Sequence, residues 1–186
     1  VNSVGGIAVP ALLKALGVEV IHELNCEPNG KFAHNPEPLP EHLSALCSEV
    51  KFHKADIGIA VDPDVDRLAL IDEKGIPFGE EYTLVAVADY VLGVKKGNTV
   101  SNLSSSKALR DISKKHGVEY TASAVGEVHV VEKMKATNAI IGGEGNGGVI
   151  LPELHYGRDA LVGIALFLSH LATSNKSTHA LRSLYP

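Results

Sequence analysis

The chain has little cysteine, no cluster of basic residues and no long apolar run, and each absence excludes a class of protein. Cys26 and Cys47 are the only cysteines among 186 residues, and with no secretory leader in view this favours a cytoplasmic protein with free thiols. The net charge is -5 and Lys and Arg form no cluster, so the basic surface of a nucleic-acid-binding protein is missing. No apolar run approaches the roughly 20 residues that span a bilayer. We expect neither nucleic acid nor a membrane as a partner.

The length lies between one ordinary domain and two small ones, and 45% of the residues are hydrophobic, enough for a real core. We predict two domains, residues 1–93 and 94–186, divided at the polar, glycine-bearing segment 93–98. Residues 1–6 resemble a strand that ends in a glycine turn, and residues after 174 have linker composition. We therefore expect further domains of the same polypeptide at both ends.

Hydrophobic periodicity predicts α/β structure throughout. In the first half it predicts a helix over 11–16, strands over 18–24, 56–61 and 68–72, a helix from about residue 41, and a helix over 81–92. Residues 25–40 hold four prolines and should form a loop. The second half alternates strands (99–103, 119–122, 139–142) with helices (107–116, 127–135), before a last helix capped by Asp159. The fold class predicted is α/β, with two consecutive three-layer domains and mixed, mostly parallel sheets.

Three aspartates at alternate positions, Asp62, Asp64 and Asp66, form the most informative motif. Carboxylates this close repel one another, and a hard cation that prefers oxygen ligands resolves the repulsion. We predict Mg²⁺. A solvated acidic turn is the plain alternative. An EF-hand calcium loop is another, with Glu73 at its twelfth position, but Arg67 stands where that loop needs glycine and both flanks are predicted strands.

Arg67 directly follows the aspartates. A guanidinium beside a metal suits a phosphate ligand, because its planar fork matches the phosphate oxygens. The alternative is that Arg67 pairs with Asp66 and neutralises the loop.

A glycine-rich loop follows the strand predicted at 139–142, and Glu144 and Asn146 project from it. A carboxylate and an amide together suit neighbouring sugar hydroxyls. A dinucleotide site would need a helix to open directly after the glycines, and residues 149–152, which end in proline, oppose one. A plain hairpin remains the alternative.

Weaker candidates lie elsewhere. Ser104, Ser105 and Ser106 could contact phosphate or simply cap a helix. His34, His129 and His155 show no spacing typical of a ligand set. Arg158 could reach an anion or form a surface ion pair.

Residues 62–67, 125–127, 143–148 and 157–161 together resemble the α-D-phosphohexomutases, which include phosphoglucomutase, phosphomannomutase and phosphoglucosamine mutase. Members have four domains, and the whole chain resembles the second and third. The resemblance implies that the aspartates hold Mg²⁺ and that Arg67 assists phosphoryl transfer. It implies that Glu144 and Asn146, with Glu127 and Arg158, bind the phosphorylated hexose.

The resemblance also implies a mechanism that this chain cannot complete alone. In the family, a phosphorylated serine in the first domain donates its phosphoryl group to the sugar phosphate. The resulting bisphosphate turns over before the serine is rephosphorylated, and the fourth domain binds the phosphate that is not reacting. Both domains lie outside the chain, so we expect the fragment to be inactive alone and to bind Mg²⁺ weakly. The rival is a non-catalytic Ca²⁺- or carbohydrate-binding module, and a kinase or phosphatase with an aspartate nucleophile is a third reading.

Overall fold

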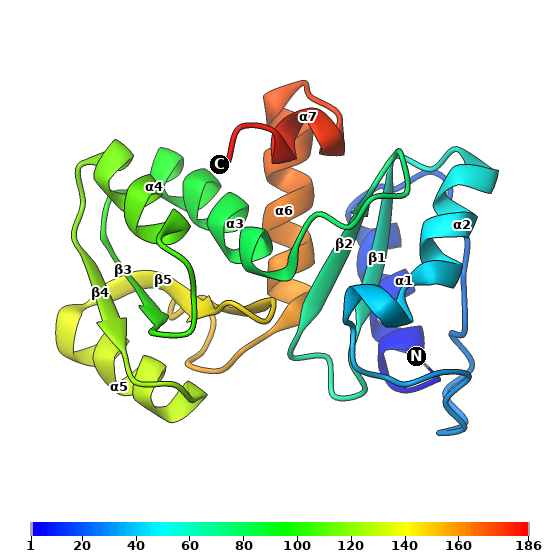
Figure 1. The fold of residues 1–186 in the computed structure, drawn as a ribbon, viewed down its shortest axis with the longest axis horizontal. Helices are drawn as coiled ribbons and strands as arrows, with labels where there is room; N and C mark the ends of the chain where they lie inside the picture. The colour runs from blue at the N-terminus through cyan, green and yellow to red at the C-terminus, as the bar shows by residue number, and fades with distance from the viewer. Residues whose placement is uncertain (1, 186) are drawn as a thin grey trace.

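The computed structural model describes residues 2–185 and contains two sheets (Figure 1). β1 (Ile57–Val61) and β2 (Leu68–Asp72) form an antiparallel pair. The second sheet has the strand order β4-β3-β5-β6, and its strands are β3 (Asn98–Asn102), β4 (Tyr120–Ser123), β5 (Ala139–Glu144) and β6 (Gly148–Ile150). β4 and β5 run parallel to β3, and β6 runs antiparallel to β5. This sheet is mixed and mostly parallel, as predicted for the α/β class.

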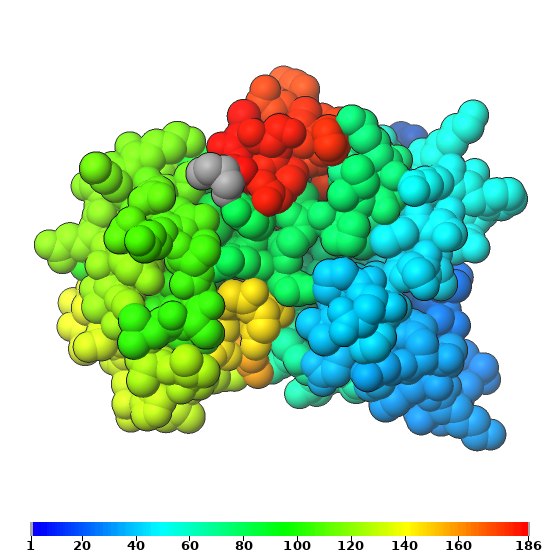
Figure 2. Space-filling view, viewed as in Figure 1, coloured from blue at the N-terminus to red at the C-terminus, as the bar shows by residue number. Residues whose placement is uncertain are grey.

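Helices cover both sheets. The α-helices are α1 (Gly5–Ala15), α2 (Ser44–His53), α3 (Glu80–Val94), α4 (Ala108–His116), α5 (Glu127–Thr137), α6 (Ala160–Ser174) and α7 (Thr178–Arg182). α5 packs on β3, β4 and β5, and α3 and α4 also contact this sheet; Figure 1 shows them on opposite sides of it. α2 packs on β1 and β2, and α3 and α6 both contact β2. In Figure 2 the C-terminal residues lie against the segment that contains α3.

The residues of β2 are all buried, and they alternate between two cores. Leu68 and Leu70 pack into the main core with α3 and α6 residues, whereas Ala69 and Ile71 pack in a smaller cluster with α2 residues. Successive strand side chains point to opposite faces, so a five-residue strand fills both. The main core also contains Ile141 of β5, so α3 and β2 connect the two sheets through one apolar interior.

The strands and helices whose bounds were predicted in the second half are confirmed within two residues at each end, and the largest differences are that α5 extends to Thr137 and β5 to Glu144. The predicted cap is confirmed too, because the Asp159 side chain accepts hydrogen bonds from the amides of Leu161 (2.8 Å) and Val162 (3.1 Å). Both strands that flank the aspartates are present, so the EF-hand alternative, which needs flanking helices, is wrong.

The strand predicted at residues 18–24 is wrong, because this segment pairs with no strand. It lies across a groove of about 780 Å³ from β1, and Val20 is 69% exposed. Alternating apolar residues form a strand only where a neighbouring strand supplies hydrogen-bond partners. Residues 18–24 have the alternating apolar residues but no neighbouring strand to bond with.

Two predicted helix starts are also corrected. α1 begins at Gly5 rather than at residue 11, since the glycines that suggested a turn allow close packing instead: a Cβ on Gly6 would lie 1.8 Å from the Cys26 carbonyl oxygen. The helix predicted from residue 41 divides into a 3₁₀ turn, Pro40–His42, and α2, which begins at Ser44. The division of the chain at residue 93 stays a prediction. No helix within residues 2–185 is long and apolar enough to cross a membrane.

Candidate active site

The candidate site lies where the aspartate loop between β1 and β2 meets the glycine loop between β5 and β6. One backbone hydrogen bond joins these two loops, and a second joins the aspartate loop to the start of α6. The Leu68 amide donates to the Gly147 carbonyl (3.2 Å), and the Ala160 amide at the start of α6 donates to the Val65 carbonyl (3.0 Å). The two motifs that the sequence placed 80 residues apart are therefore neighbours in the folded chain.

Asp62 organises the aspartate loop from within. Its side chain is fully buried, and one carboxylate oxygen accepts from the amides of Asp66 and Arg67, both at 3.0 Å. The other oxygen accepts from Arg67 Nε at 2.6 Å. Burial works against ionisation, but the hydrogen bonds from Arg67 and Asp66 outweigh it and lower the pKa of Asp62. Val65 adopts a left-handed φ of 62°, which is unusual for a β-branched residue and marks a tightly constrained loop.

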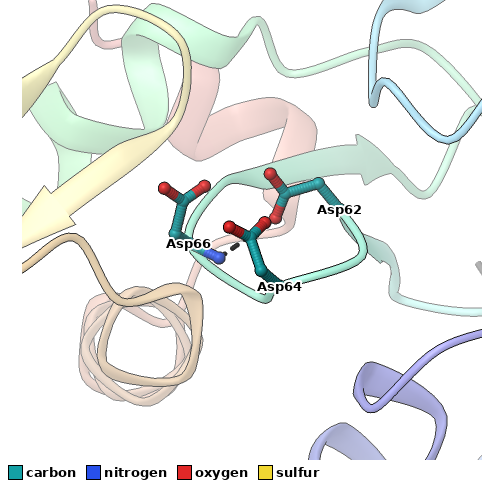
Figure 3. Close-up of side chains that lie close together, drawn as sticks. All are labelled: Asp62, Asp64 and Asp66. Carbon is teal, nitrogen blue, oxygen red and sulfur yellow. Dashed lines mark hydrogen bonds between the residues drawn. The ribbon is translucent and has the colours of Figure 1, made fainter.

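The three aspartates converge as the metal prediction requires. One carboxylate oxygen from each of Asp62, Asp64 and Asp66 lies within 4.8 Å of the others (Figure 3). Burial, together with the nearby Asp62 and Asp64 carboxylates, raises the pKa of Asp66 to about 6. Burial is the largest cause of this shift, and the repulsion from Asp62 and Asp64 adds to it; a bound dication would relieve that repulsion. An all-oxygen set of three carboxylates fits Mg²⁺, Mn²⁺ or Ca²⁺.

Arg67 is held mainly by two carboxylates. Its terminal nitrogens donate to both oxygens of Glu37, at 2.5 and 3.0 Å, and its Nε donates to Asp62. The Glu37 hydrogen bond is the largest cause of the raised Arg67 pKa. Asp66 lies farther away, at 3.6 Å from Nε, so the pairing with Asp66 that was the alternative prediction is the weakest of these contacts.

Arg158 contacts three carboxylates, each from a different segment. Nη1 donates to Glu144 (2.9 Å), Nε donates to Glu127 (3.0 Å), and Nη2 donates to Asp66. The Arg158 side chain is only 18% exposed. It is therefore a partly buried junction between the two loops, and its ion pairs are not the exposed surface pair that was one of the two alternatives.

Glu144 is almost completely buried and turns toward the protein. One of its oxygens accepts from Asn102 Nδ2 (2.6 Å) and from the Gly126 amide (3.2 Å). Asn146 is exposed, and its side-chain oxygen accepts from the Gly148 amide at 3.2 Å. The structure thus brings Glu144, Glu127 and Arg158 together with the aspartates, whereas Asn146 lies on the same hairpin outside this network.

Sequence reasoning missed Glu37 and Asn102. Glu37 comes from the proline-rich loop and carries no spacing signal. Asn102 ends β3 and accepts from the Ser104 (2.9 Å) and Ser105 (2.8 Å) hydroxyls. A buried Asn at the carboxyl end of a parallel strand, followed by serines, is a usable signal. The Ser106 hydroxyl accepts from the Ala108 amide (3.1 Å) just before α4, whose N-cap is Lys107, and His155 Nε2 lies 2.9 Å from Asp159 Oδ2.

The network is strongly acidic. It holds six carboxylates, on Asp62, Asp64, Asp66, Glu37, Glu127 and Glu144, against the two guanidinium groups of Arg67 and Arg158. The excess of four negative charges favours a cation and opposes a bare anion. An anionic ligand therefore gains from a metal beside it.

Fold and site together define an α/β protein with a candidate divalent-metal centre next to a glycine hairpin. Two family models match the chain: phosphoglucomutase/phosphomannomutase, alpha/beta/alpha domain II, over residues 1–75, and domain III of the same family over residues 79–186. The chain belongs to the phosphoglucomutase/phosphomannomutase family. The two models meet at residues 75–79, so all of α3 falls in the second match.

Relatives agree with this assignment. A phosphoglucomutase/phosphomannomutase of Thermococcus kodakarensis is 38% identical over 94% of this chain and 39% of its own length. A probable phosphoglucosamine mutase of Methanosarcina barkeri is 40% identical over 87% of this chain and 37% of its own length. The chain thus spans about two fifths of these relatives.

Solved structures share the fold. A putative phosphomannomutase from Thermus thermophilus has a TM-score of 0.89 at 25% identity, and covers 98% of this chain and 43% of its own. A phosphoglucomutase/phosphomannomutase family protein from Burkholderia thailandensis has a TM-score of 0.87 at 28% identity, over 100% of this chain and 41% of its own.

Proposed function

We propose that this chain supplies the metal-binding and sugar-recognition parts of a longer phosphohexomutase. The longer enzyme would interconvert hexose 1-phosphate and hexose 6-phosphate through a phosphoserine and a bisphosphate intermediate. The observation that carries the proposal is the convergence of Asp62, Asp64 and Asp66 beside the Glu144 hairpin, in a chain of this family. The reactive serine and a further phosphate-binding domain would belong to the remainder of the longer protein, which we predict to be cytoplasmic.

Asp62, Asp64 and Asp66 would hold Mg²⁺, which when bound neutralises charge on the oxygens of the transferring phosphoryl group. Asp62 is fixed by two backbone amides and Arg67, so its contribution is already oriented. Asp64 is exposed and is therefore the ligand most free to adjust.

Arg67 would assist phosphoryl transfer from beside the aspartates. Both of its terminal nitrogens donate to Glu37, so contact with a phosphoryl oxygen requires Glu37 to release at least one hydrogen bond. The Glu37 side chain is 45% exposed, and exposed ion pairs contribute little to stability. Release of one of the two hydrogen bonds leaves the other in place.

Sugar recognition is assigned to Glu144 and Asn146, with Glu127 and Arg158 completing the site. Glu144 has a fixed orientation because Asn102 and the Gly126 amide hold one of its oxygens. A sugar hydroxyl can donate a hydrogen bond to a lone pair of the Glu144 carboxylate that the protein leaves unused, and the exposed Asn146 amide can both donate and accept. This pair suits glucose, mannose, glucosamine and N-acetylglucosamine phosphates alike.

The test is an assay of the intact longer protein against these hexose 1-phosphates and 6-phosphates with Mg²⁺ present. We expect turnover of at least one, loss of that turnover in Asp64→Asn, and none from the 186-residue chain alone. Tight Ca²⁺ binding in a calorimetric titration, with no turnover of any sugar phosphate by the intact protein, would instead support the non-catalytic module.

A further inference from the structure

Arg158 is held so that its guanidinium can serve three partners at once. Its stem lies against Gly148: a Cβ there would come within 2.4 Å of Arg158 Cδ. Three of its nitrogens then face Glu127, Glu144 and Asp66. Arg158 is thus positioned by the glycine hairpin and reaches across to the aspartate loop.

The three partners differ in what else they must do. Glu144 is 5% exposed and is fixed from behind by Asn102 and Gly126. Glu127 is the first residue of α5 and also accepts from the Arg158 amide at 3.4 Å. Asp66 alone belongs to the triad that can hold a metal. Glu127 and Glu144 can therefore stay bound to Arg158, whereas a metal would compete with Arg158 for Asp66.

A dication and the Arg158 guanidinium both require the Asp66 carboxylate. Two positive centres on one carboxylate repel each other, and the metal carries the higher charge. The guanidinium retains Glu127 and Glu144 if it leaves Asp66, so leaving costs one hydrogen bond and strands no charge.

We infer that Arg158 is the internal counter-ion of Asp66, displaced by the metal, and that its released Nη2 group then donates to an anionic oxygen of the sugar phosphate. This inference rests on the proposed function and deepens it. The metal and the sugar phosphate then promote each other's binding through one side chain, and by linkage the promotion is equal in both directions. Arg158 thus competes with the metal for Asp66 and, once released, binds the anion.

The first test measures the affinity of the chain for Mn²⁺, a hard paramagnetic cation, from the electron paramagnetic resonance signal of free Mn²⁺. We expect Arg158→Met to tighten Mn²⁺ binding about tenfold, because a charged hydrogen bond no longer competes for Asp66. Arg110→Met is the matched control, since Arg110 is exposed and contacts only Asp111 among the described ion pairs. Measurement in about 0.5 M KCl screens the loss of a distant charge. Unchanged or weaker binding in Arg158→Met would overturn the inference.

Loss of Arg158 leaves Glu144 without its cation, which could unfold the chain. The double variant Arg158→Met with Glu144→Gln removes that charge, and it is compared with Glu144→Gln alone. We expect the double variant to bind Mn²⁺ about tenfold more tightly than Glu144→Gln alone. If the wild type binds no Mn²⁺, or if the Asp64→Asn variant binds Mn²⁺ as tightly as the wild type, the proposed function fails at its metal site. If binding depends on Asp64 but not on Arg158, only the present inference fails.

The second test repeats the Mn²⁺ titration with glucose 1-phosphate, corrected by a protein-free titration for Mn²⁺ bound to the sugar phosphate. We expect the sugar phosphate to tighten Mn²⁺ binding at least about threefold in wild type and to have no such effect in Arg158→Met. Equal coupling in both proteins, or none in wild type, would overturn the assignment of Nη2 to the anion.

Discussion

The Leu68 amide donates a hydrogen bond to the Gly147 carbonyl oxygen over 3.2 Å. Arg67 directly precedes Leu68, and Asn146 directly precedes Gly147, so this bond sets the separation between the phosphoryl side and the sugar side of the proposed site. Such a contact between backbones is rigid, because it depends on no side-chain rotamer.

Gly147→Ala should break this junction. Gly147 has a φ of 87°, and a Cβ would lie 2.3 Å from the Leu68 carbonyl oxygen. Left-handed backbone strain and a clash with main chain act together, so we expect the free energy of unfolding to fall by about 2 kcal/mol or more. Urea unfolding followed by circular dichroism measures this.

Gly145→Ala is the matched control on the same loop. Its nearest atom would be the Ser105 hydroxyl oxygen at 3.1 Å, and a hydroxyl can rotate away. We expect a change below about 1 kcal/mol. Similar losses at both positions would show that the Leu68 contact is not what holds the hairpin.

Local signals were enough for much of the fold and for half of the site. Apolar strands, the Asp159 cap and the alternate aspartates are each encoded within a few residues, and the structure confirms these elements and the convergence of the triad. The segment 18–24 failed because strand formation needs a partner that its own alternation does not specify.

The other half of the site depends on contacts between residues far apart in sequence. Glu37 lies 30 residues before Arg67, and Asn102 lies 42 residues before Glu144. No periodicity links such positions, so only the folded chain pairs them. Arg158 is the clearest case: the sequence leaves open an anion ligand or a surface ion pair, and only the folded chain brings it to carboxylates 14, 31 and 92 residues away.

Asp62→Asn and Asp64→Asn should separate structural from metal-binding roles. Asp62 is fully buried and accepts three hydrogen bonds, one from the Asp66 amide and two from the amide and Nε of Arg67. An amide cannot accept at both positions, and Arg67 loses part of its counter-charge. We expect Asp62→Asn to lower the free energy of unfolding by about 2–3 kcal/mol without metal.

Asp64 is exposed, so Asp64→Asn should change the metal-free stability by less than about 0.5 kcal/mol while it abolishes stabilisation by added Mg²⁺. Thermal unfolding with and without about 10 mM Mg²⁺, a concentration chosen because weak binding stabilises only at high ligand, compares the two variants. A large metal-free loss in Asp64→Asn would contradict this division of roles.

Asp89 should set the acid stability of the region around the C-terminal segment. Its carboxylate, on α3, accepts from Lys115 Nζ at 3.1 and 3.2 Å and from the Tyr185 hydroxyl at 3.2 Å, and it lies 2.6 Å from His116 Nε2. Burial opposes its charge, but the hydrogen bonds from His116 and Lys115 outweigh burial and hold the pKa of Asp89 below its ordinary value.

A folded-state pKa below the unfolded value means that Asp89 stabilises the fold fully above about pH 4 and loses this contribution as the pH falls through the folded value. We therefore expect Asp89→Asn to lower the free energy of unfolding by about 2 kcal/mol at pH 7. The difference in the free energy of unfolding between wild type and variant should shrink at pH 3, and urea titrations at pH 7, 5 and 3 measure it.

Asp111→Asn is the control. Asp111 is exposed and lies 3.5 Å from Arg110, so its replacement should lower the free energy of unfolding by less than about 0.5 kcal/mol at all three pH values. A wild-type advantage over Asp89→Asn that stayed constant down to pH 3 would mean that neutral contacts, and not the carboxylate charge, join α3 to α4 and Tyr185.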